Sequence, residues 1–125
     1  MNRTVAAVTL AMALAGCASM GGAPAVAKFD GSTLVDSAGM TLYTFDKDAA
    51  GSGKSACNGQ CAVNWPPLHA SGYDQGSGDW SIVVRDDGSR QWAYKGKPLY
   101  LWSKDHKPGD RTGDGFLRLW HIATR

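Results

Sequence analysis

Two aspartates lie at equivalent positions of a segment that the chain contains twice. The first copy ends at Asp48 and the second at Asp105, and both read G-x-x-L-Y-x-(aromatic)-x-K-D. Two carboxylates can perform acid–base chemistry or hold a metal when the fold brings them roughly 5–10 Å apart in a cleft. An aspartate after a strand can instead accept hydrogen bonds from the backbone of its own loop and fix a turn. Because both copies need the same turn, the repetition favours this structural role.

The histidines give little support for a metal site. His69, His106 and His121 show neither H-x-H nor H-x-x-x-H spacing, so they could bind zinc or copper only if the fold gathered them. The one local carboxylate neighbour is Asp105, which precedes His106. His121 alternates with Trp120 and is expected on the exposed face of the last strand. We therefore predict no metal site and no cofactor.

The N-terminal segment has the composition of an export signal. A positive charge precedes an apolar run over residues 5–14, which is shorter than the roughly 20 residues that cross a bilayer as a helix. The sequence Leu-Ala-Gly-Cys at 14–17 resembles the bacterial lipobox, in which the cysteine is lipidated and becomes the first residue of the mature chain. The resemblance implies a signal peptide over 1–16 and lipid on Cys17. Ala18 in place of aspartate resembles the default for outer-membrane sorting.

Composition points to a β-rich domain after a short tether. The small residues that follow Cys17 lack periodicity, so we expect 17–28 to be a flexible lipidated tether. The 13 basic and 11 acidic residues form no long block of one charge, and no nucleic-acid partner is expected. Every acid is aspartate, a residue of caps and turns, and the chain has 16 glycines. Frequent aromatic residues favour strands.

The apolar pattern predicts an all-β domain over 29–125, a small antiparallel sandwich or barrel. Short strands are expected at 33–35, 41–46, 80–85, 91–95, 99–103 and 116–122. The first two should form a hairpin, and the strand at 99–103, apolar on both faces, should be central. Residues 61–65 could form one helical turn.

The repeated segment divides this domain into tandem repeats at about 29–70 and 80–125. Two similar halves should pack about a pseudo-two-fold axis, so that neither folds alone. Their aromatic side chains are expected mostly in a shared core: Tyr43, Phe45, Trp65, Trp92, Tyr100, Trp102 and Trp120.

The repeats resemble a bacterial family of secreted-repeat predicted lipoproteins that carry a Y-x-(F/W/Y)-x-x-D motif. The motif residues in the two copies are Tyr43, Phe45, Asp48, Tyr100, Trp102 and Asp105. The stretch C-x-G-x-C-A-x-x-W-P-P at 57–67 extends the resemblance. It implies a surface or periplasmic lipoprotein, and the family carries no established biochemical function.

Cys57 and Cys61 are the only thiols that remain once Cys17 is lipidated. An exported chain meets an oxidising compartment, so a structural disulfide is favoured. The closed loop is short, so its entropic stabilisation is on the order of 2 kcal/mol or less. A redox-active pair is the alternative, although active dithiols usually have the closer C-x-x-C spacing.

These features predict a lipid-anchored envelope protein whose domain is a non-enzymatic binding or structural module. It would contact the membrane through lipid at Cys17, sit in the outer membrane facing the periplasm or the cell surface, and bind an envelope protein or polymer. The alternative is a periplasmic redox or metal-handling protein that uses Cys57, Cys61 and histidines. A cell-wall hydrolase would depend only on the two aspartates and the compartment.

Overall fold

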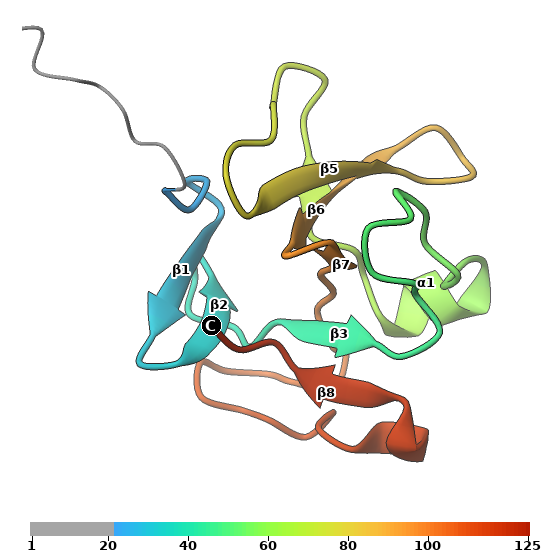
Figure 1. Cartoon of the computed structure of the whole chain (residues 1–125). Helices are drawn as coiled ribbons and strands as arrows, with labels where there is room; N and C mark the ends of the chain where they lie inside the picture. Colours follow the sequence, from blue (N-terminus) through green and yellow to red (C-terminus); the bar gives the residue numbers. More distant parts are fainter. Residues whose placement is uncertain (1–21) are drawn as a thin grey trace, which may run out of the picture.

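The computed structural model describes residues 22–125, and Cys17 with its lipobox lies outside them. The described chain consists mostly of short strands, with one short α-helix and one 3₁₀ helix (Figure 1): β1 (Ala27–Asp30), β2 (Thr33–Asp36), β3 (Tyr43–Phe45), α1 (Gln60–Asn64), β4 (His69–Ala70), β5 (Trp80–Val84), β6 (Arg90–Tyr94), β7 (Lys97–Pro98), η1 (Phe116–Arg118) and β8 (Trp120–Ile122). The predicted all-β class and the helical turn near residue 61 are confirmed.

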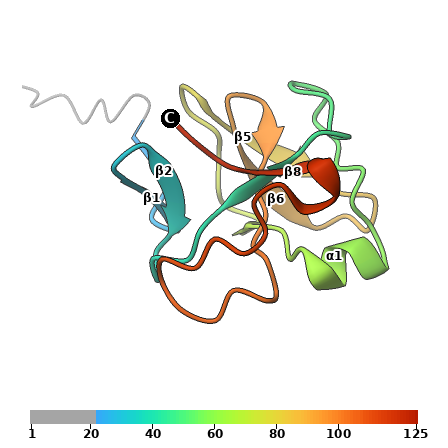
Figure 2. The ribbon, with the colours of Figure 1, turned by 90° about the horizontal axis from the view of Figure 1, so that it is seen from below.

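The described strands form three antiparallel sheets and do not close into a barrel. One sheet is the β1–β2 hairpin, the second pairs β3 with β8, and the third has the order β4-β6-β5 with β7 added to β6. The β1–β2 hairpin and α1 lie on opposite sides of the molecule, with β3 and β8 between them (Figure 2). The two outer parts are therefore joined through the paired strands in the middle.

The two copies of the repeated segment meet at Tyr43 and Tyr100. The backbone N–H of Tyr43 donates to the carbonyl of Tyr100 at 2.8 Å, and the N–H of Tyr100 donates to the carbonyl of Tyr43 at 2.9 Å. A residue that pairs with its own counterpart in the other repeat must lie beside the axis that relates the repeats. The predicted pseudo-two-fold axis therefore passes between these tyrosines.

Each repeat pairs its motif segment with the end of the other repeat. In the first, β3 pairs with β8, and Asp46 N donates to Leu119 O at 2.8 Å. In the second, Tyr100 bridges to Pro67, and Ser103 N donates to Asn64 O at 3.0 Å. These bonds correspond to each other about the axis. The repeats are thus interlocked.

Two hydrophobic clusters fill the interior. The buried members of the first lie among the hairpins of the two repeats: Ala27, Leu34, Leu42, Leu68, Ala70, Trp80, Trp92, Tyr94, Leu99 and Ala123. The buried members of the second surround the central strands: Tyr43, Phe45, Cys57, Trp65, Tyr100, Trp102 and Trp120. Both clusters draw residues from both repeats, so neither half contains a complete core.

Two details of the predicted first repeat differ in the structure. Strand β2 pairs with β1 over its whole length, and the predicted hairpin with 41–46 is present only as a short contact over 34–42, where Leu42 N donates to Leu34 O at 3.0 Å and Asp36 N donates to Met40 O at 2.8 Å on either side of the Val35–Thr41 bridge. The tether also ends earlier than expected, because β1 begins at Ala27, which is buried and donates to Pro24 O at 3.0 Å. Antiparallel pairing with β2 orders these residues, which carry no strong strand pattern of their own.

Two predicted strands of the second repeat are also wrong. Residues 99–103 form isolated bridges through Tyr100 instead of a regular strand, although they lie centrally between Tyr43 and Pro67. The last strand begins at Trp120 because η1 precedes it, and Leu117 and Arg118 have φ values of 52° and 58°. A left-handed backbone at those residues is incompatible with an extended strand.

The interlocked pairing makes a direct prediction about the separated halves. A chain of residues 17–70 should lack a cooperative thermal transition, because β3 loses β8 and Trp65 loses Trp120. Differential scanning calorimetry of this half and of residues 17–125 tests the expectation. Mixing the half with residues 71–125 should restore a transition. A cooperative transition in 17–70 alone would contradict the interlocked architecture.

Candidate functional site

The motif tyrosines and aspartates bond across the two repeats. The Tyr43 hydroxyl donates to Asp105 Oδ2 at 2.6 Å, and the Tyr100 hydroxyl donates to Asp48 Oδ2 at 2.5 Å. All four side chains are buried. Each copy of the motif thus donates one hydrogen bond to the other copy and accepts one from it, and both bonds hold the repeats together.

The second oxygen of each carboxylate fixes its own loop. Asp48 Oδ1 accepts from the backbone N–H of Ala56 at 2.7 Å. Asp105 Oδ1 accepts from the N–H of Thr112 at 3.0 Å and from its hydroxyl at 2.6 Å. These are the loop contacts expected of a turn-setting aspartate, whereas the bonds across the repeats were not foreseen. The backbone N–H of His106 donates to Asp110 at 2.8 Å, not to its neighbour Asp105.

Burial controls the protonation of these groups. Desolvation raises the pKa of Asp48, although the Ala56 N–H, the Tyr100 hydroxyl and the charge of Arg85 oppose it. Burial and then the hydrogen bond to the partner carboxylate also raise the pKa of both Tyr43 and Tyr100 well above that of a free phenol. The tyrosines therefore remain protonated donors across the physiological pH range.

A buried arginine extends the Asp48 side of the network. Arg85 is only 5% exposed, and its Nη1 donates to Ser55 Oγ at 2.9 Å and to Gln91 Oε1 at 2.8 Å. Its Nη2 donates to the carbonyl of Cys57. Ser55 Oγ lies 2.6 Å from the Tyr100 hydroxyl, so a continuous chain of contacts joins Asp48 to Arg85. Sequence reasoning missed this arginine, whose only signal is a charge at the end of an alternating strand.

The motif aromatics form a stack in the core rather than a surface groove. Trp65 and Trp120 lie at equivalent places in the repeats and stack with ring centroids 3.8 Å apart. Phe45 stacks on Trp120 at 4.2 Å, and Trp102 stacks on Trp65 at 4.0 Å. Each motif aromatic therefore packs on a tryptophan from the other repeat. Such contacts contribute roughly 0.5–1.5 kcal/mol each beyond the burial of their area.

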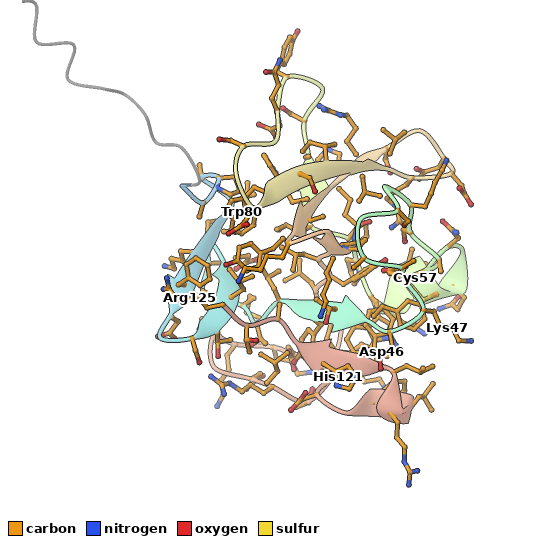
Figure 3. The ribbon with its side chains drawn as sticks, viewed as in Figure 1. Asp46, Lys47, Cys57, Trp80, His121 and Arg125 are labelled. Carbon is orange, nitrogen blue, oxygen red and sulfur yellow. A yellow bond between two sulfur atoms is a disulfide. The ribbon has the colours of Figure 1, made fainter. Side chains whose placement is uncertain are left out.

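The predicted disulfide between Cys57 and Cys61 is present, with an S–S distance of 2.06 Å. Cys57 is fully buried within the aromatic cluster, and Figure 3 shows it between α1 and the central strands. Among residues 22–125, no three His, Cys, Asp or Glu side chains gather closely enough to hold a metal ion. Within the same range, no helix has the length and apolar character that crossing a membrane requires.

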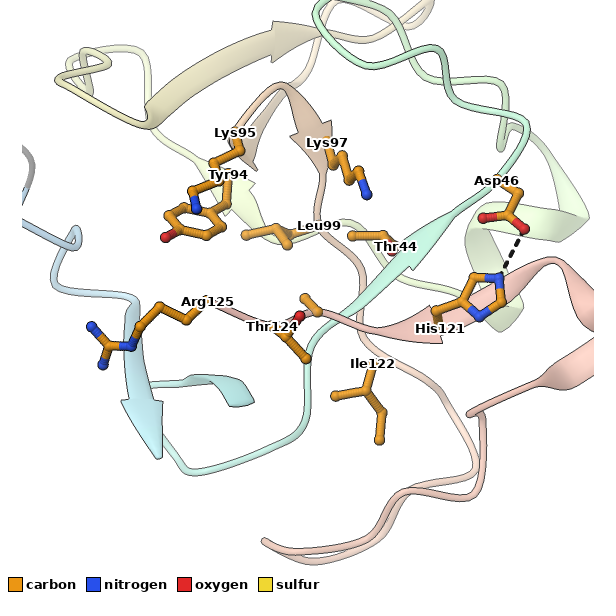
Figure 4. Close-up of a pocket in the computed structure, with 11 residues that line it drawn as sticks. Thr44, Asp46, Tyr94, Lys95, Lys97, Leu99, His121, Ile122, Thr124 and Arg125 are labelled. Carbon is orange, nitrogen blue, oxygen red and sulfur yellow. Dashed lines mark hydrogen bonds and ion pairs between the residues drawn. The ribbon is translucent and has the colours of Figure 1, made fainter. Parts of the chain in front are cut away.

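An open depression lies on the outer side of β3 and β8, with a volume of about 350 Å³ (Figure 4). Its lining comes from β3, β8, the β6–β7 turn and the residues after β8: Thr44, Asp46, Tyr94, Lys95, Lys97, Leu99, His121, Ile122, Ala123, Thr124 and Arg125. At one end, His121 Nε2 lies 2.8 Å from Asp46 Oδ2. His121 is exposed, as predicted, but its partner was missed because it lies on a distant strand.

Comparison with known proteins finds one family. The sequence model of a family described as a secreted repeat of unknown function matches residues 25–69 and 81–124. The chain belongs to this family. The two matches correspond to the two interlocked repeats, so the family unit is half of the folded domain. No curated protein and no solved structure matches the chain.

Bonding across the repeats can be measured with double-mutant cycles. Tyr100→Phe and Asp48→Asn should couple by about 0.5–3 kcal/mol in urea unfolding, because they remove two ends of one buried bond. Tyr43→Phe with Asp48→Asn, a pair from one repeat without a shared bond, should be additive within about 0.5 kcal/mol. Tyr73→Phe is the control, since Tyr73 is 96% exposed. Strong coupling within one repeat and none between repeats would contradict the assignment.

The raised pKa of Asp48 predicts a definite pH dependence. The native state keeps a proton at pH values where the unfolded chain, with its ordinary pKa of 3.8, has lost it. Stability therefore falls as pH rises from the unfolded pKa through the folded one. Asp48→Asn removes this loss, so in urea unfolding the stability of the variant relative to the wild type should rise as pH increases above 3.8, by at most about 1.4 kcal/mol per pH unit, and level off once the native carboxyl has ionised.

Asp87→Asn provides a control of opposite sign. Hydrogen bonds from Ser89 lower the pKa of Asp87, so its charge stabilises the native state above the ordinary pKa, and this contribution disappears as pH falls. The free energy of unfolding of the asparagine variant should therefore fall relative to that of the wild type as pH rises. Parallel pH profiles for the two variants would contradict the assigned burial of Asp48.

Proposed function

We propose that this secreted-repeat protein is a lipid-anchored component of the cell envelope and that its domain is a non-enzymatic binding module. The arrangement of Asp48 and Asp105 carries the proposal. Every oxygen of these two carboxylates accepts a hydrogen bond inside the fold. The residues that the repeats share are thus used for assembly, and the open depression on β3 and β8 is available for a ligand.

The burial of the motif argues against a hydrolytic role. Asp48 and Asp105 are 9% and 7% exposed, and neither lines the depression. A general acid or base needs hydrogen-bond reach to the substrate proton. The disulfide likewise supports a structural rather than a redox or metal-handling role for Cys57 and Cys61, because the closed pair presents no thiolate to a metal.

The anchoring part of the proposal depends on the lipobox at 14–17. The family description of a secreted repeat supports export, and lipidation at Cys17 would hold the exported chain in the membrane through several acyl chains. Nine residues separate Cys17 from the first strand. Fully extended, such a segment spans about 30 Å at most. The domain would then work within a short distance of the membrane surface.

Lipidation at Cys17 is tested by labelling cells with palmitate. The wild-type chain should incorporate label and sediment with membranes, and Cys17→Ser should abolish both. The control variant with Cys57→Ser and Cys61→Ser should keep the label, because the acceptor is intact. Label on the Cys17→Ser chain would contradict the anchor. Catalytic turnover by the purified protein that Asp48→Asn or Asp105→Asn abolishes would contradict the non-enzymatic role.

A further inference from the structure

The turn between β6 and β7 carries two lysines at the edge of the depression. Tyr94 pairs with Lys97, so the turn consists of Lys95 and Gly96 alone, with φ values of 49° and 79°. Turns with two positive φ values favour Asn-Gly, and other residues with a Cβ are disfavoured in the left-handed region because the Cβ crowds the following carbonyl oxygen. Lysine is therefore a destabilising choice for this turn, and strain of this kind gathers at functional sites.

The turn is held firmly against the rest of the domain. Gly51 N donates to Gly96 O at 2.9 Å, and a Cβ at Gly96 would lie 2.6 Å from Gly51 N. Lys95 N donates to Asp79 O at 2.7 Å. The backbone under both lysines is thus fixed from two sides, which limits the conformational entropy lost when their side chains bind a ligand.

The fold of the repeat does not require these lysines. Aligning the two motif copies places Ala38 and Met40 of the first repeat at the positions of Lys95 and Lys97. Gly39 corresponds to Gly96 and also has a positive φ, 87°. The glycine is therefore common to both repeats, whereas the two cations belong to the second alone. A structural need shared by the repeats does not account for them.

Positive side chains outnumber negative ones in the lining of the depression. Among the described residues, the one ion pair within 4.0 Å joins His121 to Asp46. The lining holds three basic side chains and one acid: Lys95, Lys97, Arg125 and Asp46. By contrast, the whole chain is near balance, with 13 basic and 11 acidic residues. Asp46 is already paired with His121, so an anion entering the depression would meet two lysines that no carboxylate pairs with within 4.0 Å among the described residues.

Hydroxyl groups line the other parts of the depression. Thr44 projects from β3 and Thr124 follows β8, and their side chains make no hydrogen bond to residues 22–125. Figure 4 shows Lys95 and Lys97 on one side of the depression and Thr124 with His121 on the opposite side. A ligand between them would meet charged donors on one side and neutral hydroxyls on the other. A depression of about 350 Å³ is at the small end of ligand pockets.

We infer that this depression binds a small acidic sugar, a ligand that carries a carboxylate or phosphate among several hydroxyl groups. The anion would contact Lys95 and Lys97, and sugar hydroxyls would bond to Thr44, Thr124 and the His121 ring. The inference rests on the proposed binding function and names the ligand class for it.

Isothermal titration of the full chain in detergent tests the ligand class. The probes are digalacturonate, glucose 1-phosphate, neutral maltose and inorganic phosphate, each at low salt. At least one acidic sugar should bind about tenfold or more tightly than maltose and inorganic phosphate, since it alone combines charge with hydroxyls. Equal binding of maltose would overturn the role of charge. If inorganic phosphate binds as tightly as glucose 1-phosphate and digalacturonate does not bind, the role of the sugar is overturned.

Substitutions at the turn test the site. Lys95→Asn with Lys97→Gln should weaken binding about tenfold, whereas Lys54→Gln with Lys104→Gln, which removes the same charge from exposed positions outside the depression, should leave it unchanged. Lys95→Asn alone should raise the melting temperature while weakening binding, because asparagine suits the turn. Equal losses in the two double variants, or none in either, would overturn the assignment.

Sedimentation with isolated envelope fragments separates this inference from the proposed function, provided that every chain compared carries Cys17→Ser, so that lipid cannot hold it to the membrane. If the chain with both lysines sediments and the double variant at Lys95 and Lys97 sediments more weakly, the result supports both the binding function and the site. Equal sedimentation of these two chains overturns the site while the binding function stands. A chain with both lysines that neither sediments with the fragments nor binds any acidic sugar overturns both.

Discussion

The hydrogen bond from each motif tyrosine to the aspartate of the other repeat is the interaction on which the domain depends. It is made twice, on either side of a pseudo-two-fold axis between Tyr43 and Tyr100. A buried carboxylate without partners would be costly, so each aspartate needs both its own loop and the opposite tyrosine. Assembly of the two repeats and closure of their loops are therefore one event.

Patterns within single segments predicted much of the fold. The strands β5 and β6, the helix near residue 61 and the disulfide all follow from alternation, local sequence and compartment. The partners of β3 did not follow, because a repeated segment is equally compatible with pairing inside its own repeat and with pairing to the other. The hairpin predicted for 33–35 and 41–46 forms only around the Val35–Thr41 bridge, whereas β3 itself pairs with β8 of the other repeat.

The candidate site was harder to predict than the core. Tyr43, Asp48 and their counterparts were found because they repeat, and repetition marks what both halves need to fold. Lys95 and Lys97 do not repeat, and they line the same depression as His121 only because β3 pairs with β8 and the β6–β7 turn lies beside these strands. An internal repeat in the sequence therefore identifies the residues of the scaffold more readily than those of the candidate site. Arg85 was missed for a related reason, since it lies outside the repeated segment and its partners Ser55 and Cys57 come from a distant part of the chain.

Departures from the two-fold symmetry then become the informative part of the molecule. The disulfide and the Ser55–Arg85 contacts lie on the Asp48 side of the axis, whereas on the Asp105 side the N–H of Gly113 donates to the Tyr43 hydroxyl at 3.3 Å and the Thr112 hydroxyl donates to Asp105 at 2.6 Å. A fold that needed only two equal halves would not retain a buried arginine, whose desolvation is expensive. Arg85 and the lysine turn belong to the second repeat, whereas the disulfide and Ser55 belong to the first, so each repeat adds its own features to a scaffold that the symmetric bonds hold together.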